Sequence, residues 1–279
     1  MGSSNMDLII YSDRLPKRGE TVTGGFFKQF MGGKGANQSV AAVRSGSKTY
    51  FICKIGEDVY GNEMIAHLQK ENIECDNIIR DKDMPSGIAF IMVDKDGENM
   101  ISVAPGANAL LRPQEITKRK KLILNASSIV VQMEIPIENV DIIIPNEGEL
   151  FQMHFLQDLG ELNGEIKEKI INASKDISDL GVDTIITTLG SKGCYIYSEK
   201  IGISTLLPAY KVKALDTVGA GDCFNGVLAS MLTQGKDIID ATKYAISAAS
   251  IAVTKKGAQN SMPFKKAIER RFLDYKKFY

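Results

Sequence analysis

Several residue types that mark specialised protein classes are scarce in this chain. Its 279 residues contain no tryptophan, only two histidines and only four cysteines. The cysteines, at positions 53, 75, 194 and 223, lie far apart and form no C-x-x-C pair, which argues against a zinc site or a redox motif. Such scattered cysteines indicate reduced thiols, and we therefore expect a cytoplasmic protein.

The chain also has no excess of positive or negative charge and no long apolar run. The 34 Lys and Arg residues balance the 34 Asp and Glu residues, so the formal net charge is zero. Proteins that bind nucleic acids or membrane surfaces usually show a basic excess, and we expect neither partner here. No apolar run approaches the ~18 residues that cross a bilayer, and no signal peptide is visible at the N-terminus.

The two histidines limit the chemistry that the chain can use. His67 and His154 each lie in a helix-like stretch with no other histidine or cysteine nearby. Histidine is the commonest general base in enzymes. If the chain is an enzyme, its base is therefore expected to be a carboxylate.

The apolar pattern predicts an α/β protein. Short β-branched runs alternate with helical patterns, which is typical of βαβ units and a mostly parallel sheet. We expect buried strands at 127–133, 141–145 and 183–190. We expect helices at 35–46, 61–72, 222–235 and 237–255, the last of them capped by Gly257.

Two regions break this alternation. Residues 86–106 alternate on both sides of "DKDG", a hairpin signal. Residues 8–30 look like two further strands joined by a polar turn. We interpret the four strands as a small antiparallel sheet that covers the α/β core as a lid.

The stretch "DTVGAGDCFNG", residues 216–226, combines a glycine-rich turn with a carboxylate at the start of a helix. A helix N-terminus binds anions through unpaired N–H groups, and Gly219 and Gly221 allow close approach of the backbone. Asp222 would repel a bound phosphate unless it accepts a proton from the attacking hydroxyl. The alternative is a tight turn in which Asp222 is an N-cap. No Gly-Lys-Ser/Thr follows, so this is not a Walker A loop.

A second glycine cluster favours the chemical interpretation. "MGGKGANQ", residues 31–38, places three glycines around Lys34 at the start of another helix, and "GSSNMD" places Asn5 and Asp7 before the lid strands. Asn, Asp and Lys side chains can hold vicinal hydroxyl groups through paired donors and acceptors. Together the two stretches indicate a polyhydroxylated substrate.

These motifs resemble those of the ribokinases, in the phosphofructokinase-B-like family of carbohydrate kinases. The similar stretches are "GSSNMD", "GETVTG", "GGKGANQ", "PGAN", "QMEIP", "PNEGE", "TTLGSKG", "DTVGAGDCFNG" and "AVTKKGAQNS", which cover nearly the whole chain in order. The resemblance implies a Rossmann-like three-layer core with a β lid. It also implies a single domain over 1–279 and ATP-dependent phosphorylation of the primary hydroxyl of a sugar.

The resemblance also assigns expected roles to individual residues. Asp222 matches the catalytic base, and Gly219, Ala220 and Gly221 match the anion hole. Sugar hydroxyls are expected to contact Asn5, Asp7, Gly33, Lys34, Asn37 and Glu134. The lid residues Ala89 and Ile91 are expected to cover the apolar face of the sugar.

The remaining matches concern ATP and two metal ions. The expected nucleotide-binding residues are Asn146, Thr188, Gly190, Ser191, Gly193, Lys256, Gly257 and Ala258. Glu149 is expected to organise Mg²⁺, often through water. An activating K⁺ is expected to bind the Asp216 carboxylate, the Ser261 hydroxyl, and main-chain oxygens of Val218, Ala252, Lys255 and Gly257. Two alternatives stay open: Asn146 and Glu149 cap the following helix, and Ser261 is an ordinary turn residue.

The function expected from the resemblance is phosphorylation of the 5-hydroxyl of D-ribose. The alternatives are a kinase for deoxyribose, fructose or a nucleoside such as adenosine, and a non-catalytic sugar-binding relative. The lid strands would present an exposed sheet edge, and the family often dimerises there. We therefore expect a homodimer formed through the lid.

Two places depart from the family pattern. The family has an apolar strand before the element that contains Asn5 and Asp7, whereas only Met1 precedes Gly2 here. Only six residues, 135–140, separate the strand that ends in "QMEIP" from "DIIIPNE", although a parallel neighbour needs a crossover of at least ~10–12 residues. We predict that Val140 and Asp141 are not neighbours in the natural polypeptide. It would carry about one more β–α unit of ~30 residues there and a short strand before Gly2. The alternative is that the protein lacks this unit.

Overall fold

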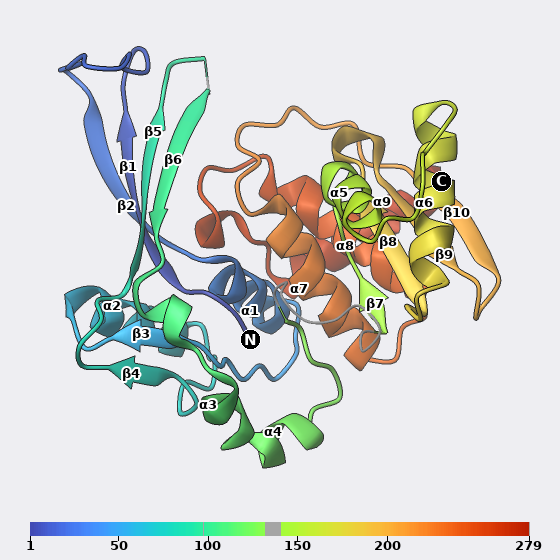
Figure 1. The fold of residues 1–279 in the computed structure, drawn as a ribbon, viewed down its shortest axis with the longest axis horizontal. Helices are drawn as coiled ribbons and strands as arrows, with labels where there is room; N and C mark the ends of the chain where they lie inside the picture. The colour runs from blue at the N-terminus through green and yellow to red at the C-terminus, as the bar shows by residue number, and fades with distance from the viewer. Residues whose placement is uncertain (97, 132–140, 279) are drawn as a thin grey trace. The chain divides into compact units, whose positions relative to one another are not determined.

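The computed structural model describes residues 1–96, 98–131 and 141–278 (Figure 1). The chain forms two compact units. The first comprises Met1–Gln132 and Lys213–Tyr279, and the second comprises Met133–Val212. Within the described residues, no helix is long and apolar enough to cross a bilayer.

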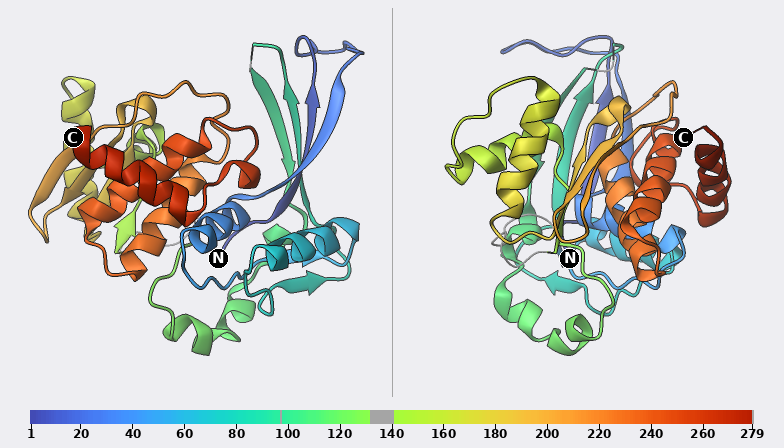
Figure 2. Two further views of the ribbon diagram at one scale, coloured as in Figure 1. Left: turned by 180° about the vertical axis from the view of Figure 1, so that it is seen from behind. Right: turned by 90° about the vertical axis from the view of Figure 1, so that its right-hand side faces the viewer.

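The first unit contains a sheet of long strands that we call the lid sheet. Its strands are β1 (Asn5–Tyr11), β2 (Phe26–Gly32), β5 (Gly87–Val93) and β6 (Asn99–Ala104), in the order β2-β1-β5-β6. β1 pairs with β5 in parallel, and the other neighbours are antiparallel. The hairpin and the strand pair expected from the sequence are therefore present, but the prediction of an antiparallel sheet is wrong: the sheet is mixed, because β1 and β5 join its two antiparallel pairs in parallel. Figure 2 shows the sheet from two further sides.

One detail of the lid differs from the sequence interpretation. Asn5 and Asp7 lie inside β1, not before the lid strands. Pairing of β1 with both β2 and β5 begins at Asn5, which is opposite Gly32 on one side and Gly87 on the other. Because both neighbours supply backbone partners there, the strand extends through the polar residues.

Helices form the other part of the first unit. α7 packs against α1 and α8, and α9 packs against α8. The helices are α1 (Lys34–Arg44), α2 (Val59–Lys70), α7 (Ala220–Thr233), α8 (Ile238–Ala252) and α9 (Lys265–Phe278), with the short α3 (Pro113–Thr117) and α4 (Lys120–Leu124). A short parallel pair, β3 (Lys54–Gly56) and β4 (Ile79–Asp81), completes the unit with the 3₁₀ turns η1 (Gly106–Leu110) and η4 (Gln259–Ser261).

The predicted end of α8 is wrong. The helix stops at Ala252 with Val253 as C-cap, and Gly257 is not its cap. A continued helix would need a hydrogen bond from Gly257 N to Val253 O. Instead, Val253 O accepts from Leu215 N at 2.7 Å, and Gly257 N donates to Asp216 Oδ2 at 2.8 Å. Contacts with the 215–216 segment therefore end the helix early.

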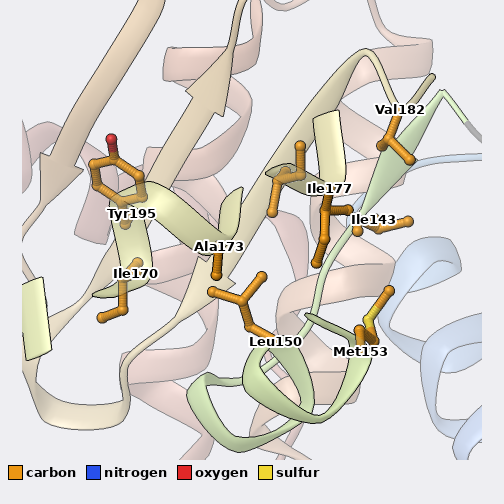
Figure 3. Packing of buried hydrophobic residues seen from close by; sticks show 9 residues of the cluster. Ile143, Leu150, Met153, Ile170, Ala173, Ile177, Val182 and Tyr195 are labelled. Carbon is orange, nitrogen blue, oxygen red and sulfur yellow. The ribbon is translucent and has the colours of Figure 1, made fainter. Parts of the chain in front are cut away.

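The second unit has its own sheet and core. The strands β7 (Ile142–Ile143), β8 (Thr184–Thr188), β9 (Cys194–Ser198) and β10 (Ile203–Leu207) lie in the order β10-β9-β8-β7. The helices α5 (Glu147–Leu156) and α6 (Ile166–Ser178) contribute Leu150, Ile170 and Ile177 to an apolar cluster that also contains Ile185 and Tyr195 (Figure 3). A 3₁₀ turn, η3 (Gly190–Lys192), connects β8 and β9.

Two predicted strands are shorter than expected or absent. No strand forms over 127–131, the described part of the predicted strand at 127–133, and Ile129 is 49% exposed. The strand predicted at 141–145 is reduced to β7, which among the described strands pairs only with β8. A strand needs a hydrogen-bonded neighbouring strand, and the described strands supply none for 127–131, where the terminal amine of Met1 donates to Val130 O at 2.6 Å. Val140 lies outside the described residues.

Candidate functional site

The N-terminus of α7 lies in the first unit and has the geometry of an anion site. Gly219 is the N-cap with a left-handed φ of 75°, which suits glycine. The first intrahelical bond runs from Cys223 N to Gly219 O at 2.8 Å, so the amides of Gly221 and Asp222 have no carbonyl partner within the helix. A Cβ at Gly221 would meet open space. The backbone at this point is accessible to a ligand.

Asp222 stands in the first turn of α7, and two amide groups of α1 hold its carboxylate. Asn37 Nδ2 donates to Asp222 Oδ2 at 2.9 Å, and Gln38 Nε2 donates to Asp222 Oδ1 at 3.0 Å. Since the N-cap is Gly219, the alternative that Asp222 is the N-cap is wrong. Burial raises the pKa of Asp222, whereas the two amides and the charge of Lys34 act in the opposite direction. The carboxylate is therefore oriented away from its own helix backbone.

Asp7 on β1 is a second buried carboxylate that interacts with Asp222. Only 9% of its surface is exposed. Burial, and then the charge of Asp222, raise the pKa of Asp7 to about 6. A Cβ at Gly32 would collide with this carboxylate, so the glycine on the neighbouring strand makes room for it. The structure thus places two carboxylates close enough to affect one another.

Asn5, also on β1, is held by a residue to which the sequence analysis gave no role. Asn108 Nδ2 donates to Asn5 Oδ1 at 2.8 Å, and Asn108 Oδ1 accepts from Ser4 N at 2.9 Å. A Cβ at Gly87 would collide with both asparagine side chains. Only the position of Asn108 in the stretch "PGAN", which resembles the family pattern, could have indicated a role for it from the sequence.

The start of α1 carries the residues of the second glycine cluster. Gly33 is the N-cap with φ of 89°, and Lys34 follows as an exposed side chain. Asn37 is 5% exposed, and its Oδ1 is buried without a hydrogen-bond partner among the described residues. A buried acceptor of this kind is unusual in a native protein. It fits a site that a ligand donor completes.

The two lid residues expected to cover the sugar share a face with Asp7. Ala89 is opposite Asp7, and Ile91 is opposite Ile9 in the parallel pairing of β1 with β5. Alternate residues of a strand point to the same side. Ala89 is buried and Ile91 is partly exposed.

Asp216, one of the residues expected to bind K⁺, joins the loop before α7 to the loop after α8. Asp216 Oδ1 accepts from Val218 N at 2.9 Å, and Asp216 Oδ2 accepts from Gly257 N at 2.8 Å. Ser261 is 1% exposed, and its hydroxyl donates to Ala258 O at 2.7 Å. The donor set consists of oxygens only, which suits a hard cation. The bond to Ala258 O also keeps open the alternative that Ser261 is a turn residue.

The other two residues of the 256–258 segment lie beside elements of the same unit. Lys256 Nζ lies 5.7 Å from the centroid of the Tyr11 ring on the lid sheet. A Cβ at Gly219 would be 3.0 Å from Ala258 Cβ, so Ala258 borders the N-terminus of α7.

The second unit holds the other expected nucleotide residues. Asn146 and Glu149 form a capping box on α5: Glu149 N donates to Asn146 Oδ1 at 2.9 Å, and Asn146 N donates to Glu149 Oε2 at 2.8 Å. The contacts expected from the alternative, in which Asn146 and Glu149 cap the helix, are therefore present. Thr188 bridges to Asn146 across the sheet. The next candidates, Gly190, Ser191 and Gly193, follow in and after η3. Glu134 lies outside the described residues.

Known proteins match this chain in both sequence and structure. The model of the pfkB family of carbohydrate kinases matches residues 1–136 and 122–265. Ribokinase of Haemophilus influenzae is 33% identical over 295 residues, with 94% of each chain covered. Deoxyribokinase of Salmonella typhi is 31% identical over 296 residues, with the same coverage. The structure of Arabidopsis thaliana ribokinase complexed with ribose and ATP matches with a TM-score of 0.82 at 28% identity, covering 97% of this chain and 96% of that one.

The alignments also show that this chain lacks residues that these relatives contain. Both sequence alignments are longer than the 279-residue chain, so they leave gaps in it. The two segments matched by the family model overlap at 122–136, close to the connection that the sequence analysis found too short. The matched segments together extend over most of the chain, and the α/β fold is the ribokinase-like fold. This chain belongs to the pfkB family of carbohydrate kinases.

Proposed function

We propose that this protein transfers the γ-phosphoryl group of ATP to the 5-hydroxyl of D-ribose. The observation that carries the proposal is the Asp222 carboxylate, held by two amides in the first turn of α7 beside open backbone N–H groups. This arrangement supplies a proton acceptor next to an anion site, which is what phosphoryl transfer to a hydroxyl requires. The ribokinase and deoxyribokinase relatives support the same chemistry.

In the proposed mechanism, Asp222 orients the attacking hydroxyl and accepts its proton. The Gly221 amide, in the turn formed by Gly219 and Ala220, would stabilise the negative charge of the transferred group, and the Ala220 amide would join it on leaving Thr217 O, to which it donates at 3.2 Å. Because the transition state of phosphoryl transfer is loose, positioning contributes more than the strength of the base. Asn5, Asp7, Gly33, Lys34, Asn37 and Glu134 would bind the sugar hydroxyls, with Ala89 and Ile91 over its apolar face.

ATP is proposed to bind the residues that match the nucleotide-binding stretches of the family. The proposed set is Asn146, Thr188, Gly190, Ser191, Gly193, Lys256, Gly257 and Ala258, and Glu149 would organise Mg²⁺ through water. Mg²⁺ would supply charge neutralisation on the phosphate groups. We also propose that residues 1–279 form a single domain.

We also propose that K⁺ activates the protein. The Asp216 carboxylate and the Ser261 hydroxyl, with main-chain oxygens of Val218, Ala252, Lys255 and Gly257, would hold the ion. The loops that Asp216 already joins lead directly into α7 and out of α8. A cation at this place would stabilise the turn that presents the anion hole.

A homodimer through the lid sheet is proposed from its apolar surface. Phe27, Ile10, Met92 and Met100 form one row across the four strands. Phe27, Ile10 and Met100 are 45–56% exposed. The row lies on the face opposite Asp7 and Ala89, because neighbouring residues of a strand alternate between faces. A second copy of the same row would cover this surface.

A panel of sugars tests the proposed function. ATP consumption is measured with D-ribose, 2-deoxy-D-ribose, D-fructose and adenosine, at equal Mg²⁺ and K⁺ concentrations. We expect the largest kcat/KM with D-ribose and identify the product as ribose 5-phosphate by NMR. Deoxyribose is the second candidate because a deoxyribokinase is among the similar relatives. Preference for another compound, or no ATP consumption with any of them, would contradict the proposal.

A further inference from the structure

The Asp222 carboxylate receives hydrogen bonds from two consecutive residues of α1, and the two donors are not equivalent. Asn37 Nδ2 reaches Oδ2, and Gln38 Nε2 reaches Oδ1. The other polar atom of the Asn37 side chain, Oδ1, is buried without a partner among the described residues. Asn37 is therefore suited to contact a ligand, whereas the contact of Gln38 is directed at the carboxylate itself.

The backbone on both sides of the Gln38 contact is closely packed. Gln38 is 8% exposed. A Cβ at Gly226 of α7 would collide with Gln38 O and would lie 2.7 Å from Ala41 Cβ. This glycine lets α1 approach α7 closely, just after the turn that carries Asp222. The donor and the carboxylate are thus attached to two helices with little freedom to separate.

We propose that Gln38 is a positioning residue, whose side-chain amide keeps the Asp222 carboxylate directed at the attacking hydroxyl, while Asn37 offers its unpaired Oδ1 to the sugar. The proposal rests on the phosphoryl-transfer function proposed above. Each carboxylate oxygen has two acceptor sites, so Asp222 Oδ1 can hold the Gln38 bond and Oδ2 can accept the substrate proton. Without Gln38 the Asn37 bond alone would hold the carboxylate, and only at Oδ2.

The charged and titratable groups around Asp222 come from three elements. Asp7 faces it from β1, Lys34 acts from the start of α1, and Cys223 follows it on α7. The Gln38 amide favours the ionised carboxylate, because it donates to the charged form. Loss of this donor should raise the pKa of Asp222, and a carboxylate at position 38 should raise it further.

Two substitutions at one position separate the contact from packing. Gln38→Met keeps the length of the side chain and removes the donor. Gln38→Glu keeps the shape and replaces the donor with a second carboxyl group. Gln234→Met is the matched control, because Gln234 is the C-cap of α7, the helix that carries Asp222, and its amide donates to Ser230 O at 3.1 Å. Thermal unfolding of all variants checks that they are folded.

The main measurement is kcat against pH at saturating ribose and ATP. Under these conditions kcat reports the ionisation of groups in the bound complex and not in the free protein. For Gln38→Met we expect kcat to fall about tenfold at pH 7. The acidic limb of the curve of kcat against pH should move to higher pH by about one unit. For Gln38→Glu we expect a larger move of the limb. The ribose KM should stay within about threefold of the wild-type value, because Gln38 does not contact the sugar.

Two other results would overturn the proposal: an unmoved acidic limb in both variants, or an effect confined to KM or to thermal stability. A readout that needs no turnover separates this proposal from the proposed function. The carboxyl carbon of Asp222 is titrated by ¹³C NMR, with Asp222→Asn for assignment. A higher pKa in Gln38→Met than in the wild type supports the positioning role even if ribose is not the substrate. Equal pKa values in the variant and the wild type would reject the positioning role, even if ribose is the substrate.

Discussion

Replacement of Asp7 by asparagine should make the protein more stable at neutral pH while it weakens ribose binding. Asp7 is buried on β1 near Asp222, and these two causes raise its pKa from 3.8 to about 6. The folded protein therefore holds the Asp7 proton more tightly than the unfolded chain does. As the pH rises from about 4 to about 6, the wild type loses stability, and above that window the loss is complete.

The magnitude follows from the pKa difference. A shift of about two units corresponds to roughly 3 kcal/mol at 1.36 kcal/mol per unit. Asparagine has nearly the same shape and carries no charge, so Asp7→Asn should recover up to this amount above pH 6. For a chain of this size that means a rise in Tm of roughly 5–10 °C. Below pH 4, where Asp7 is protonated in both states, the two proteins should unfold at nearly the same temperature.

The assay is thermal unfolding of the wild type and the variant at pH 4, 5, 6 and 7.5. Asp13→Asn, which changes an exposed aspartate between β1 and β2, is the control for removal of one negative charge. In an Asp222→Asn background the gain from Asp7→Asn should shrink, because the neighbouring charge is gone. An Asp7→Asn variant that is equally or less stable at pH 7.5 would refute the reasoning. Calorimetric titration completes the test, since unchanged ribose affinity would remove Asp7 from the site.

Three further predictions test the proposed roles. Asp222→Asn should lower kcat by ~10²–10⁴ with ribose affinity nearly kept, as expected for a general base; turnover within about threefold of the wild type would mean a structural role. Replacement of Na⁺ by K⁺ at constant ionic strength should raise kcat, because the ion would stabilise the loops joined by Asp216; equal rates would leave the cation site without support. Phe27→Lys should convert a dimer into a monomer in sedimentation experiments, because it places a charge on the apolar row of the lid sheet; an unchanged state would exclude this face.

Local sequence signals predicted those parts of the fold that local physics determines. Gly33 and Gly219 mark the starts of α1 and α7, because both have positive φ as N-caps. The "DKDG" signal predicted the β5–β6 hairpin, which pairs as expected. These features depend on backbone conformations that one or two residues specify, so they can be read from the sequence.

Features that depend on distant partners were missed. The end of α8 is set by Leu215 and Asp216, which lie more than thirty residues earlier in the chain. The roles of Gln38 and Asn108 come from contacts with Asp222 and Asn5, across 184 and 103 residues of sequence. Both residues stand inside stretches that resemble family motifs, but a motif does not state which neighbour a side chain contacts. Tertiary structure supplied that information.

The connection between residues 135 and 141 leads to the last prediction, which concerns the natural polypeptide. The segment 127–131 ends in three β-branched residues but forms no strand, and β7 has only β8 as a described neighbour. Each observation is expected if a strand is missing from the chain at this point. The overlap of the two family-model segments at 122–136, and alignments longer than the chain, agree with a gap at this place. We therefore predict about one more β–α unit of ~30 residues between Val140 and Asp141.

Intact-mass measurement of the protein from its natural source tests this prediction. A mass about 3 kDa above that of the 279-residue chain, with new peptides between residues 135 and 141, would support the additional unit. Insertion of the unit should also raise the Tm of the recombinant chain, because it would give 127–131 a partner and bury Ile129. A natural protein with Val140 joined directly to Asp141 would contradict the prediction. The unit would then be a true deletion, and the ribose kinase assay would decide whether the shortened sheet still supports catalysis.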